Sequence, residues 1–279
     1  MSIRILTDTA CDLTKEEYKK YNVEYLPLIV SFGEQDYYDN ETITANEFYE
    51  KLVSATTLPR TSQITPFRYE EKLEELTENG DSVILITLSS KLSGTYKSAC
   101  TAALNFDNVY VVDSLGATLT QKLLVIYAAQ LVQKGLTAKE IVDELNEKKT
   151  KIRLYAAVDT LDYLKKGGRV SAAAATVGNM LNLKPIVSII DGEVKNVSKA
   201  IGNRRANKVI LDLVNSTNGI NFDLPMGTLY AGDKDNLTKL LTDLSNVLTD
   251  SNDILECIIG PTIGTHVGPG AFGIAYFEK

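Results

Sequence analysis

The sequence predicts an α/β fold, because short apolar runs alternate along the chain with segments of helical periodicity. Residues 83–86 (VILI) form a nearly continuous apolar run, as expected of a strand that is buried on both faces. Strands are expected at residues 3–7, 25–30, 82–87, 109–112, 153–158, 186–190, 227–231, 254–260 and 274–277.

Capping signals predict the helices between these strands. Thr14 and Glu17 form a capping box before a helix that reaches about Tyr21, and Thr137 opens a second box for a helix continuing to Lys148. Pro66 is suited to the first turn of a helix that ends near residue 77. Further helices are expected at residues 44–53, 94–104, 199–214 and 237–248.

No tandem repeat and no linker rich in Pro, Gly or Ser marks a domain boundary, so the boundary is argued from the pattern of elements. A helix ends near Lys149 and a new strand begins at Ile152. We therefore expect two α/β domains, residues 1–151 and 152–279.

The composition, 44% hydrophobic and 23% charged, is that of an ordinary soluble globular protein. The net charge of -7 argues against nucleic acid or an anionic membrane as a partner, because both require a basic surface. The longest apolar stretch, residues 123–132, is too short to span a bilayer, so no stable membrane insertion is expected. The N-terminus enters a strand pattern without the features of a signal peptide, which predicts a cytoplasmic location.

Neither a metal nor a cofactor is predicted. Cys11, Cys100 and Cys257 are widely spaced and form no Cys-x-x-Cys pair, so we expect buried small hydrophobic residues rather than disulfides or a zinc site. A single histidine excludes a paired-histidine metal motif. Residues 268–273 match G-x-G-x-x-G, but only six residues follow, which excludes the dinucleotide-binding motif.

His266 is the only histidine, and it lies in an expected loop with glycines at 264, 268, 270 and 273. Histidine changes charge near neutral pH, and glycines let the backbone turn sharply and approach a ligand closely. A lone histidine in a loop is more often structural than catalytic. The surrounding glycines make a functional interpretation about equally probable.

A candidate anion site follows the buried strand at residues 82–87. Ser93 and Gly94 come after this strand and immediately before a helix, where a hydroxyl and unpaired amides meet. Ligands of open α/β sheets bind at the carboxyl ends of strands. The alternative, that Ser93 only caps its helix, carries equal weight.

Two further segments carry candidate residues. Thr61 and Ser62 lie in a polar loop and could donate to an anion, although the nearby Thr65 is more simply an N-cap. Arg169 follows two glycines that end a helix, and its planar fork suits a carboxylate or a phosphate. The alternative is a basic helix C-terminus that complements the helix dipole, which explains the preceding lysines better than Arg169.

Five motifs occur in a characteristic order: TDT at 7–9, TSQ at 61–63, SKLSGT at 90–95, KKGGRVS at 165–171 and HVGPG at 266–270. On these motifs the chain resembles the DegV family over its whole length. Members are also known as the fatty-acid-binding subunits of bacterial fatty acid kinase. Cys11 stands where alanine is more usual, which we expect to be harmless.

The resemblance implies two α/β domains with a long-chain fatty acid, such as palmitate, stearate or oleate, in a tunnel between or beneath them. It also implies that Thr61, Ser93 and His266 hold the carboxylate, with Arg169 nearby. In that family a separate kinase subunit phosphorylates the bound acid to an acyl phosphate for phospholipid synthesis. The binding subunit does no chemistry alone.

The physical chemistry agrees with this implication. Burial of about 14 methylenes at ~0.8 kcal/mol each supplies most of the affinity, before the cost of association. The Ser93 hydroxyl, the Gly94 amide and Thr61 would then hold the carboxylate oxygens and fix its orientation. A helix expected at 172–181 offers small side chains beside an alkyl tail, or is simply a tightly packed core helix.

Two other classes of function are consistent with parts of the sequence. A hydrolase would use Ser93 as nucleophile, His266 as base and an acid such as Asp113 as orienter, but Ser93 is not in a G-x-S-x-G turn. An interaction module would show neither a bound lipid nor turnover. The anion-site pattern and the resemblance favour the lipid carrier.

Overall fold

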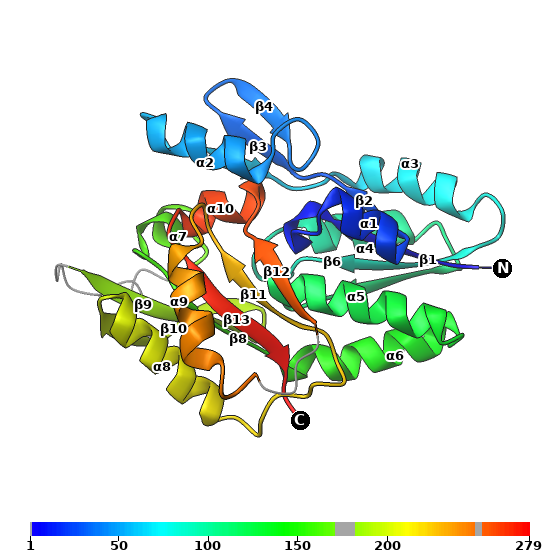
Figure 1. Ribbon diagram of the computed structural model, residues 1–279. Coiled ribbons are helices and arrows are strands. Elements are labelled where there is room, and N and C mark those ends of the chain that lie inside the picture. Colours follow the sequence, from blue (N-terminus) through cyan, green and yellow to red (C-terminus); the bar gives the residue numbers. More distant parts are fainter. Residues whose placement is uncertain (1, 171–181, 249–252) are drawn as a thin grey trace.

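The computed structural model describes residues 2–170, 182–248 and 253–279, and it confirms the predicted α/β fold. The strands of this part of the chain form sheets of four, six and three strands (Figure 1). Residues of the four- and three-stranded sheets precede residue 151, and those of the six-stranded sheet follow it. The proposed division into two domains stays a prediction.

The four-stranded sheet is parallel, in the order β2-β1-β6-β7. Its strands are β1 (Ile3–Asp8), β2 (Val23–Leu26), β6 (Ser82–Thr87) and β7 (Val109–Asp113). Helices pack on both faces, as Figure 1 shows, which is why the run from Val83 to Ile86 is completely buried. These helices are α1 (Lys15–Tyr21), α3 (Pro66–Thr77), α4 (Thr95–Ala103), α5 (Leu119–Gln133) and α6 (Ala138–Lys148).

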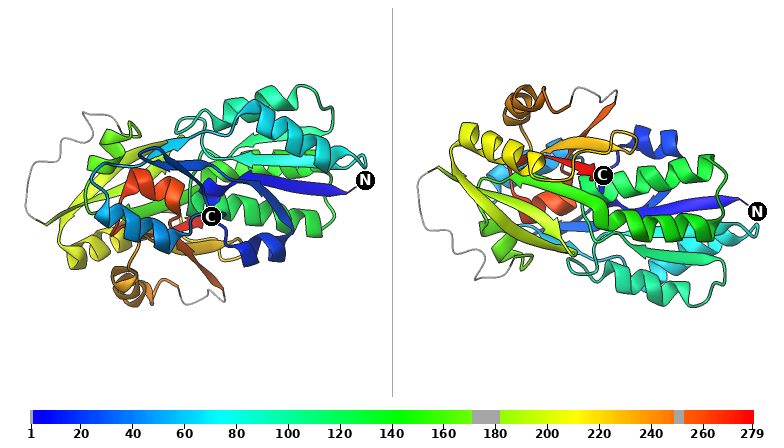
Figure 2. Two further views of the ribbon diagram at one scale, coloured as in Figure 1. Left: turned by 90° about the horizontal axis from the view of Figure 1, so that it is seen from above. Right: turned by 90° about the horizontal axis from the view of Figure 1, so that it is seen from below.

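The six-stranded sheet has the order β10-β9-β8-β13-β11-β12 and mixes parallel and antiparallel pairs. Its strands are β8 (Ile152–Ala157), β9 (Leu183–Ile190), β10 (Glu193–Ile201), β11 (Met226–Tyr230), β12 (Ile254–Ile258) and β13 (Phe272–Phe277). Helices α8 (Asn203–Asn215) and α9 (Asp235–Leu244) cover one face (Figures 1 and 2). The opposite face is turned toward the first half of the chain and contributes to the larger core.

The three-stranded sheet is antiparallel, in the order β4-β3-β5, and it lies with α2 at the top of Figure 1. Its elements are β3 (Ile29–Phe32), β4 (Gln35–Tyr38), β5 (Arg60–Ser62) and α2 (Ala45–Ser54). The short helix α10 (Pro261–Val267) contacts α2, β3 and β5 on one side and α7 (Asp162–Lys166) on another. The contacts with α2, β3 and β5 place α10, which lies near the end of the sequence, beside residues about 200 positions earlier.

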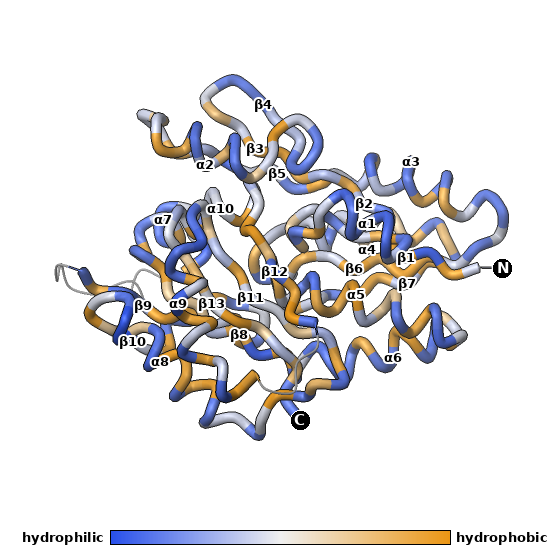
Figure 3. The backbone as a smooth tube through the Cα atoms, in the orientation of Figure 1, coloured by the Kyte–Doolittle hydropathy of each residue, from blue (hydrophilic) through white to orange (hydrophobic). Residues whose placement is uncertain are grey.

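Helix α5 joins the two halves of the molecule. It packs against β1 of the four-stranded sheet and against β8, β11 and β13 of the six-stranded sheet. Leu123, Leu124 and Val125 are fully buried, as is the side chain of Lys122. Figure 3 shows the apolar segments of both halves converging on this helix. A helix that is apolar on nearly all sides lies inside a core.

The capping signals located three helices correctly. Thr14 and Thr137 form capping boxes at the starts of α1 and α6, and Thr65 caps α3, which covers the predicted residues 66–77. None of the described helices is both long and apolar enough to cross a bilayer. Among the described residues no group of three or more His, Cys, Asp or Glu side chains could hold a metal ion.

Several predicted boundaries were wrong. The strand expected at 25–30 is two strands, β2 and β3, separated at Pro27, which has no amide donor for a ladder. The helix expected at 199–214 begins only at Asn203, because residues 199–201 belong to β10 and Gly202 turns the chain with a φ of 77°. The helix expected at 237–248 is α9, which ends at Leu244.

Candidate functional site

A cavity of about 190 Å³ lies between the six-stranded sheet and the first half of the chain. Its walls are mainly aliphatic. The aliphatic residues that line it are Leu28, Leu88, Leu92, Ala117, Leu154, Ala156, Val158, Leu164, Val187, Ile189, Val194, Leu229, Ile259, Ile263, Val267 and Ala271. We call this space the acyl cavity. Its aliphatic wall offers few hydrogen-bonding groups, so it suits the apolar part of a ligand.

Strand alternation in β8 explains how the sequence makes this wall. Leu154 and Ala156 line the acyl cavity, and Val158 continues the same spacing just after the strand. Tyr155 and Ala157 belong instead to the core under α8 and α9. Successive residues of a strand point to opposite faces, so β8 separates the two apolar environments.

Thr61 and His266 meet at the polar end of the acyl cavity, where Thr61 Oγ1 lies 2.8 Å from His266 Nε2. Thr61 is held in β5 opposite Val30 of β3. His266 lies in the last turn of α10, so the prediction that it stands in a loop was wrong. The glycines in this segment gave no sign of this helix, which ends at Val267 and is followed by Gly268 as its C-cap.

The environment of His266 keeps its imidazole neutral at pH 7. Burial, and then the positive charge of Arg169, lower its pKa to about 4. Nδ1 is buried without a hydrogen-bond partner among the described residues. Since a buried N–H without an acceptor is rarer than an unfilled acceptor, we assign the proton to Nε2, which then donates to Thr61. The Thr61 hydroxyl hydrogen is left to donate to a ligand.

Glycines let the backbone close around this imidazole. A Cβ atom at Gly167 would stand 2.3 Å from His266 Nδ1, so a side chain there would displace the ring. Gly268 adopts a φ of 75°, and a Cβ there would collide with the ring of Tyr163. Gly268 thus permits the turn expected of the glycines that flank His266, and Gly167 permits the close approach of α7 to the ring, while a close approach to a ligand stays a prediction.

Ser93 and Gly94 approach the cavity from the loop after β6. The N-cap of α4 is Gly94 and not Ser93, and it forms no side-chain cap. Ser93 Oγ nevertheless accepts from the Thr95 amide at 3.2 Å and lies 2.9 Å from Thr95 Oγ1. Gly94 admits Gln63, whose Oε1 would be only 2.0 Å from a Cβ at position 94.

Arg169 links the loop after β6 to the loop after α7. As predicted, α7 ends at the glycine pair, and the Arg169 amide donates back to the Leu164 carbonyl at 2.9 Å. The guanidinium Nε donates to the Leu92 carbonyl at 3.1 Å, and Nη1 donates to the Gly167 carbonyl. Burial lowers the pKa of this guanidinium, which remains charged at neutral pH.

All six predicted site residues line the acyl cavity: Thr61, Ser62, Ser93, Gly94, Arg169 and His266. Their role in holding a fatty acid stays a prediction. Four further polar residues of the wall were not predicted from the sequence: Gln63, Thr118, Ser188 and Thr262. Gln63 belongs to the TSQ motif at 61–63 and donates to Ser98 Oγ at 3.0 Å. The other three residues belong to no sequence motif that would identify them, since only the tertiary fold brings them to the cavity.

The structure does not assemble the hydrolase triad from the described residues. Asp113 Oδ1 accepts from the amides of Ser90 and Leu115 and is not a partner of His266. Ser93 Oγ is bonded to Thr95, while His266 is bonded to Thr61. A nucleophile, a base and an orienter in hydrogen-bond contact are what that mechanism requires. The helix expected at 172–181 lies outside the described residues.

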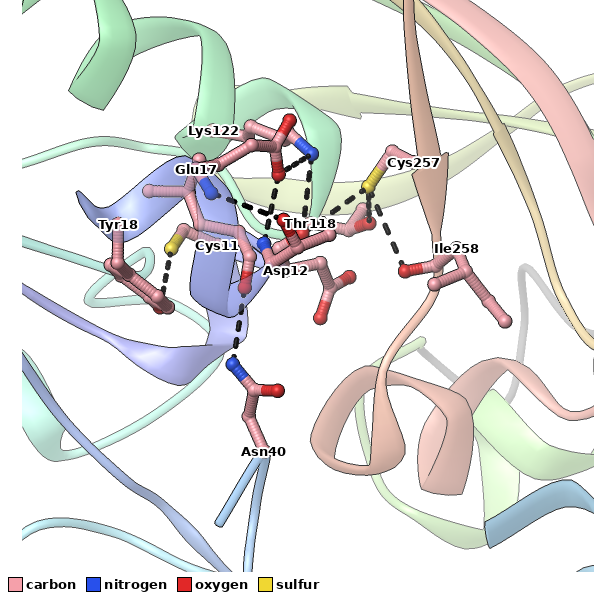
Figure 4. A network of polar contacts seen from close by, with 11 residues as sticks. Cys11, Asp12, Glu17, Tyr18, Asn40, Thr118, Lys122, Cys257 and Ile258 are labelled. Carbon is pink, nitrogen blue, oxygen red and sulfur yellow. Dashed lines mark hydrogen bonds and ion pairs between the residues drawn. The ribbon is translucent and has the colours of Figure 1, made fainter. Parts of the chain in front are cut away.

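Buried polar contacts lie next to the acyl cavity in two groups, one at Asp39 and one at Asp12 and Lys122, and Figure 4 shows the second group. Thr262 lines the acyl cavity near the start of α10, and both its amide and its hydroxyl donate to Asp39 Oδ2. Burial raises the pKa of Asp39 to about 7. This carboxyl therefore anchors one end of α10, while His266 occupies the other end.

The second group of polar contacts, which we call the Asp12–Lys122 network, includes a hydrogen bond from Lys122 Nζ to the Asp12 carbonyl at 3.4 Å (Figure 4). Lys122 Nζ lies 2.6 Å from Glu17 Oε2, which compensates the buried ammonium. Cys257 contacts the backbone carbonyl of Asp12 and the hydroxyl of Thr118 at 3.9 Å each. Cys257 and Cys11 are buried as predicted, whereas Cys100 is only half-buried, and all three are free. The network fixes α1, α5 and β12 around the cavity.

This chain is similar to known proteins over nearly its whole length. A family model described as "Uncharacterised protein, DegV family" matches residues 2–279. A DegV domain-containing protein of Caldanaerobacter subterraneus is 35% identical over 280 residues, with 99% of each chain covered. Protein DegV of Bacillus subtilis is 32% identical over 282 residues, with 100% of each chain covered.

Solved structures agree with the sequence comparison. A DegV family protein of Thermus thermophilus, described as binding fatty acid, superposes with a TM-score of 0.91 at 31% identity over 100% of both chains. The fatty acid binding protein DegV of Bacillus subtilis gives 0.87 at 32% over 100% of both chains. A stearic acid-binding protein of Eubacterium ventriosum gives 0.87 at 27%, with 100% and 99% covered. The resemblance carried by the five motifs is confirmed, and this chain belongs to the DegV family.

Proposed function

We propose that this protein binds a long-chain fatty acid, with the tail in the acyl cavity and the carboxylate at the Thr61–His266 pair. The observation that carries the proposal is this pair, hydrogen-bonded at 2.8 Å on the edge of an aliphatic cavity. Relatives of known structure are described as fatty-acid-binding, which supports the same ligand class here. The ligand is then one molecule with an anionic head and an apolar tail.

The carboxylate is held by donors from both halves of the chain. Thr61, once it accepts from His266, donates its hydroxyl hydrogen to one carboxylate oxygen. The Ser93 hydroxyl and the Gly94 amide serve the other oxygen, with Ser62 at the rim. Arg169 supplies a nearby positive charge, which favours the ionised acid.

We further propose that the bound acid is presented to a separate bacterial fatty acid kinase subunit, which phosphorylates it to an acyl phosphate for phospholipid synthesis. This chain is then a carrier in the cytoplasm and does no chemistry alone. The absence of an assembled triad in the described residues supports a carrier over a hydrolase. No nucleic acid, metal or cofactor is part of the proposal.

The proposal is tested by identifying what the protein carries. Protein purified from a bacterial host is denatured and extracted, and the extract is examined by mass spectrometry for fatty acids. We expect about one long-chain acid for each chain in the wild type and a reduced amount in His266→Ala. A p-nitrophenyl ester assay is run alongside. Ester turnover that disappears in Ser93→Ala, with no lipid recovered, would establish the hydrolase instead.

A kinase assay tests the second step. With ATP and a fatty acid kinase subunit, the wild type loaded with oleate should yield an acyl phosphate. Ser93→Ala and His266→Ala should slow its formation while their thermal unfolding stays cooperative. Unchanged acyl phosphate formation in both variants would remove these residues from the carboxylate site.

A further inference from the structure

A second cleft, of about 520 Å³, adjoins the polar end of the acyl cavity. We call it the outer cleft and define it by Arg60, Lys166 and Tyr163 together with three residues that it shares with the acyl cavity. The shared residues are Thr61, Arg169 and His266. The two spaces therefore meet at the place proposed for the ligand carboxylate.

The outer cleft is positively charged in a chain whose net charge is -7. Three of its lining residues, Arg60, Lys166 and Arg169, are cationic, and none of the described residues that line it is acidic. Arg60 and Lys166 form no ion pair within the described ranges. Cations without acidic partners around a concave surface attract an anion, and a phosphoryl group is an anion that both arginine and lysine bind.

We propose that the outer cleft holds the phosphoryl group of an acyl phosphate whose tail remains in the acyl cavity. The inference rests on the proposed function and extends it from the acid to its phosphorylated product. A group attached to a carboxylate oxygen at Thr61 and His266 extends away from the tail, and the outer cleft is the space that adjoins those residues. Arg60 and Lys166 then contact phosphoryl oxygens, while the carboxyl group keeps its donors.

The free acid and its acyl phosphate differ in charge, so the cations of the outer cleft should distinguish between them. A carboxylate carries one negative charge, whereas an acyl phosphate carries close to two near neutral pH. The neutral state of His266 leaves the cations of the outer cleft as the charged groups available to the added phosphoryl group. Arg60 and Lys166 should therefore matter for the phosphorylated ligand and matter little for the free acid.

The experiment compares two ligands of equal tail length on delipidated full-length protein. One is stearate, and the other is a stable acyl phosphate analogue in which a methylene replaces the bridging oxygen (a long-chain 2-oxoalkylphosphonate). Affinities are measured by displacement of a fluorescent fatty acid. The wild type should bind the phosphonate at least as tightly as stearate. Arg60→Ala and Lys166→Ala should each weaken the phosphonate by about threefold, and the double variant by about tenfold, because exposed cations contribute modestly.

Lys165→Ala is the matched control. Lys165 precedes Lys166 in α7 and carries the same charge, but it does not line the outer cleft. We expect it to leave the ratio of the two affinities unchanged. The inference is overturned if the double variant weakens both ligands equally, or weakens neither, or if Lys165→Ala has the same effect as Lys166→Ala.

Two further outcomes separate this inference from the proposed function. If the wild type binds stearate but not the phosphonate, fatty acid binding stands and the phosphoryl site is rejected. If the wild type binds neither, the proposed function fails. Inorganic phosphate is titrated by calorimetry in parallel: binding of phosphate as tight as that of the phosphonate, lost in the double variant, would identify a free-phosphate site and reject the acyl-linked assignment.

Discussion

The acyl cavity and the outer cleft adjoin the same three residues but differ in chemistry. The cavity is walled mainly by leucine, isoleucine, valine and alanine, whereas the cleft is lined by cations and by no described acid. Thr61 and His266 lie where one environment changes into the other. This contrast in lining suits the proposed ligand, whose apolar tail and anionic head would contact different sets of residues.

For the proposed ligand, the two regions should contribute unequal amounts of binding free energy. Each methylene moved from water into the cavity contributes about 0.8 kcal/mol, so a long tail supplies several times the free energy of any one polar contact. A hydrogen bond to a charged group contributes roughly 1.5–3 kcal/mol at most. Changes in the acyl cavity should therefore have the largest effect on affinity, and changes at the head should mainly affect selectivity.

Filling the acyl cavity should have the largest effect. Ala156 of β8 lines the cavity, and a phenylalanine there occupies space that a tail would use. We expect Ala156→Phe to weaken stearate binding by about 100-fold, equivalent to the loss of three or four buried methylenes. Octanoate, which needs less of the cavity, should be affected much less. Calorimetry with both acids measures the difference.

The control for this change is Ala45→Phe on α2, where the residue is half-buried and does not line the cavity. Thermal unfolding of both variants separates loss of the fold from loss of the space. Stearate affinity that is unchanged in a folded Ala156→Phe variant would show that the tail lies elsewhere.

Removing one hydroxyl at the boundary should have an intermediate effect. Thr61→Val keeps the shape of the side chain but leaves His266 Nε2 without its partner and removes the donor proposed for the carboxylate. We expect about tenfold weaker binding of stearate and little change for stearyl alcohol, since the lost hydrogen bond is to a charged group. Fluorescence displacement with both ligands provides the measurement.

Thr101→Val on the exposed side of α4 is the control for this exchange of residue type. It should change neither affinity. If Thr61→Val weakened the alcohol as much as the acid, Thr61 would shape the cavity without binding the carboxylate.

The fold could be predicted where the signal was local. Capping boxes at Thr14 and Thr137 and the proline after Thr65 fixed the starts of three helices, because caps depend on residues within one turn. Helix α5 received no assignment, since its fifteen residues are buried almost all round and show little amphipathic periodicity. Strand β5 is only three residues long, and its pairing with β3 depends on the tertiary fold.

The candidate site divides in the same way. Ser93 and Gly94 could be found from the chain because they lie between a buried strand and the start of a helix, and Arg169 because it follows two glycines that end a helix. The contact of Thr61 with His266 joins residues 205 positions apart, and no local pattern encodes it. Thr118, Ser188 and Thr262 could not be predicted, because strand and helix packing alone turns them toward the cavity.

The smallest expected effect concerns the charge of His266. Its pKa in the folded protein is about 4, below its ordinary value, so between pH 6.5 and 4 the unfolded chain binds a proton that the folded chain does not. The stabilising contribution of His266 is therefore present at pH 7 and falls as the pH is lowered. The buried carboxyl of Asp39, at the other end of α10, has a raised pKa, so its contribution to stability changes with pH in the opposite direction.

A comparison with His266→Gln isolates the histidine: the unfolding free energy of the wild type relative to this variant should fall by about 1 kcal/mol between pH 7 and pH 5. Chemical denaturation at both pH values measures it, and a constant difference would mean that the imidazole has its ordinary pKa in the folded protein and is charged at pH 5, at the mouth of the cavity and in the outer cleft.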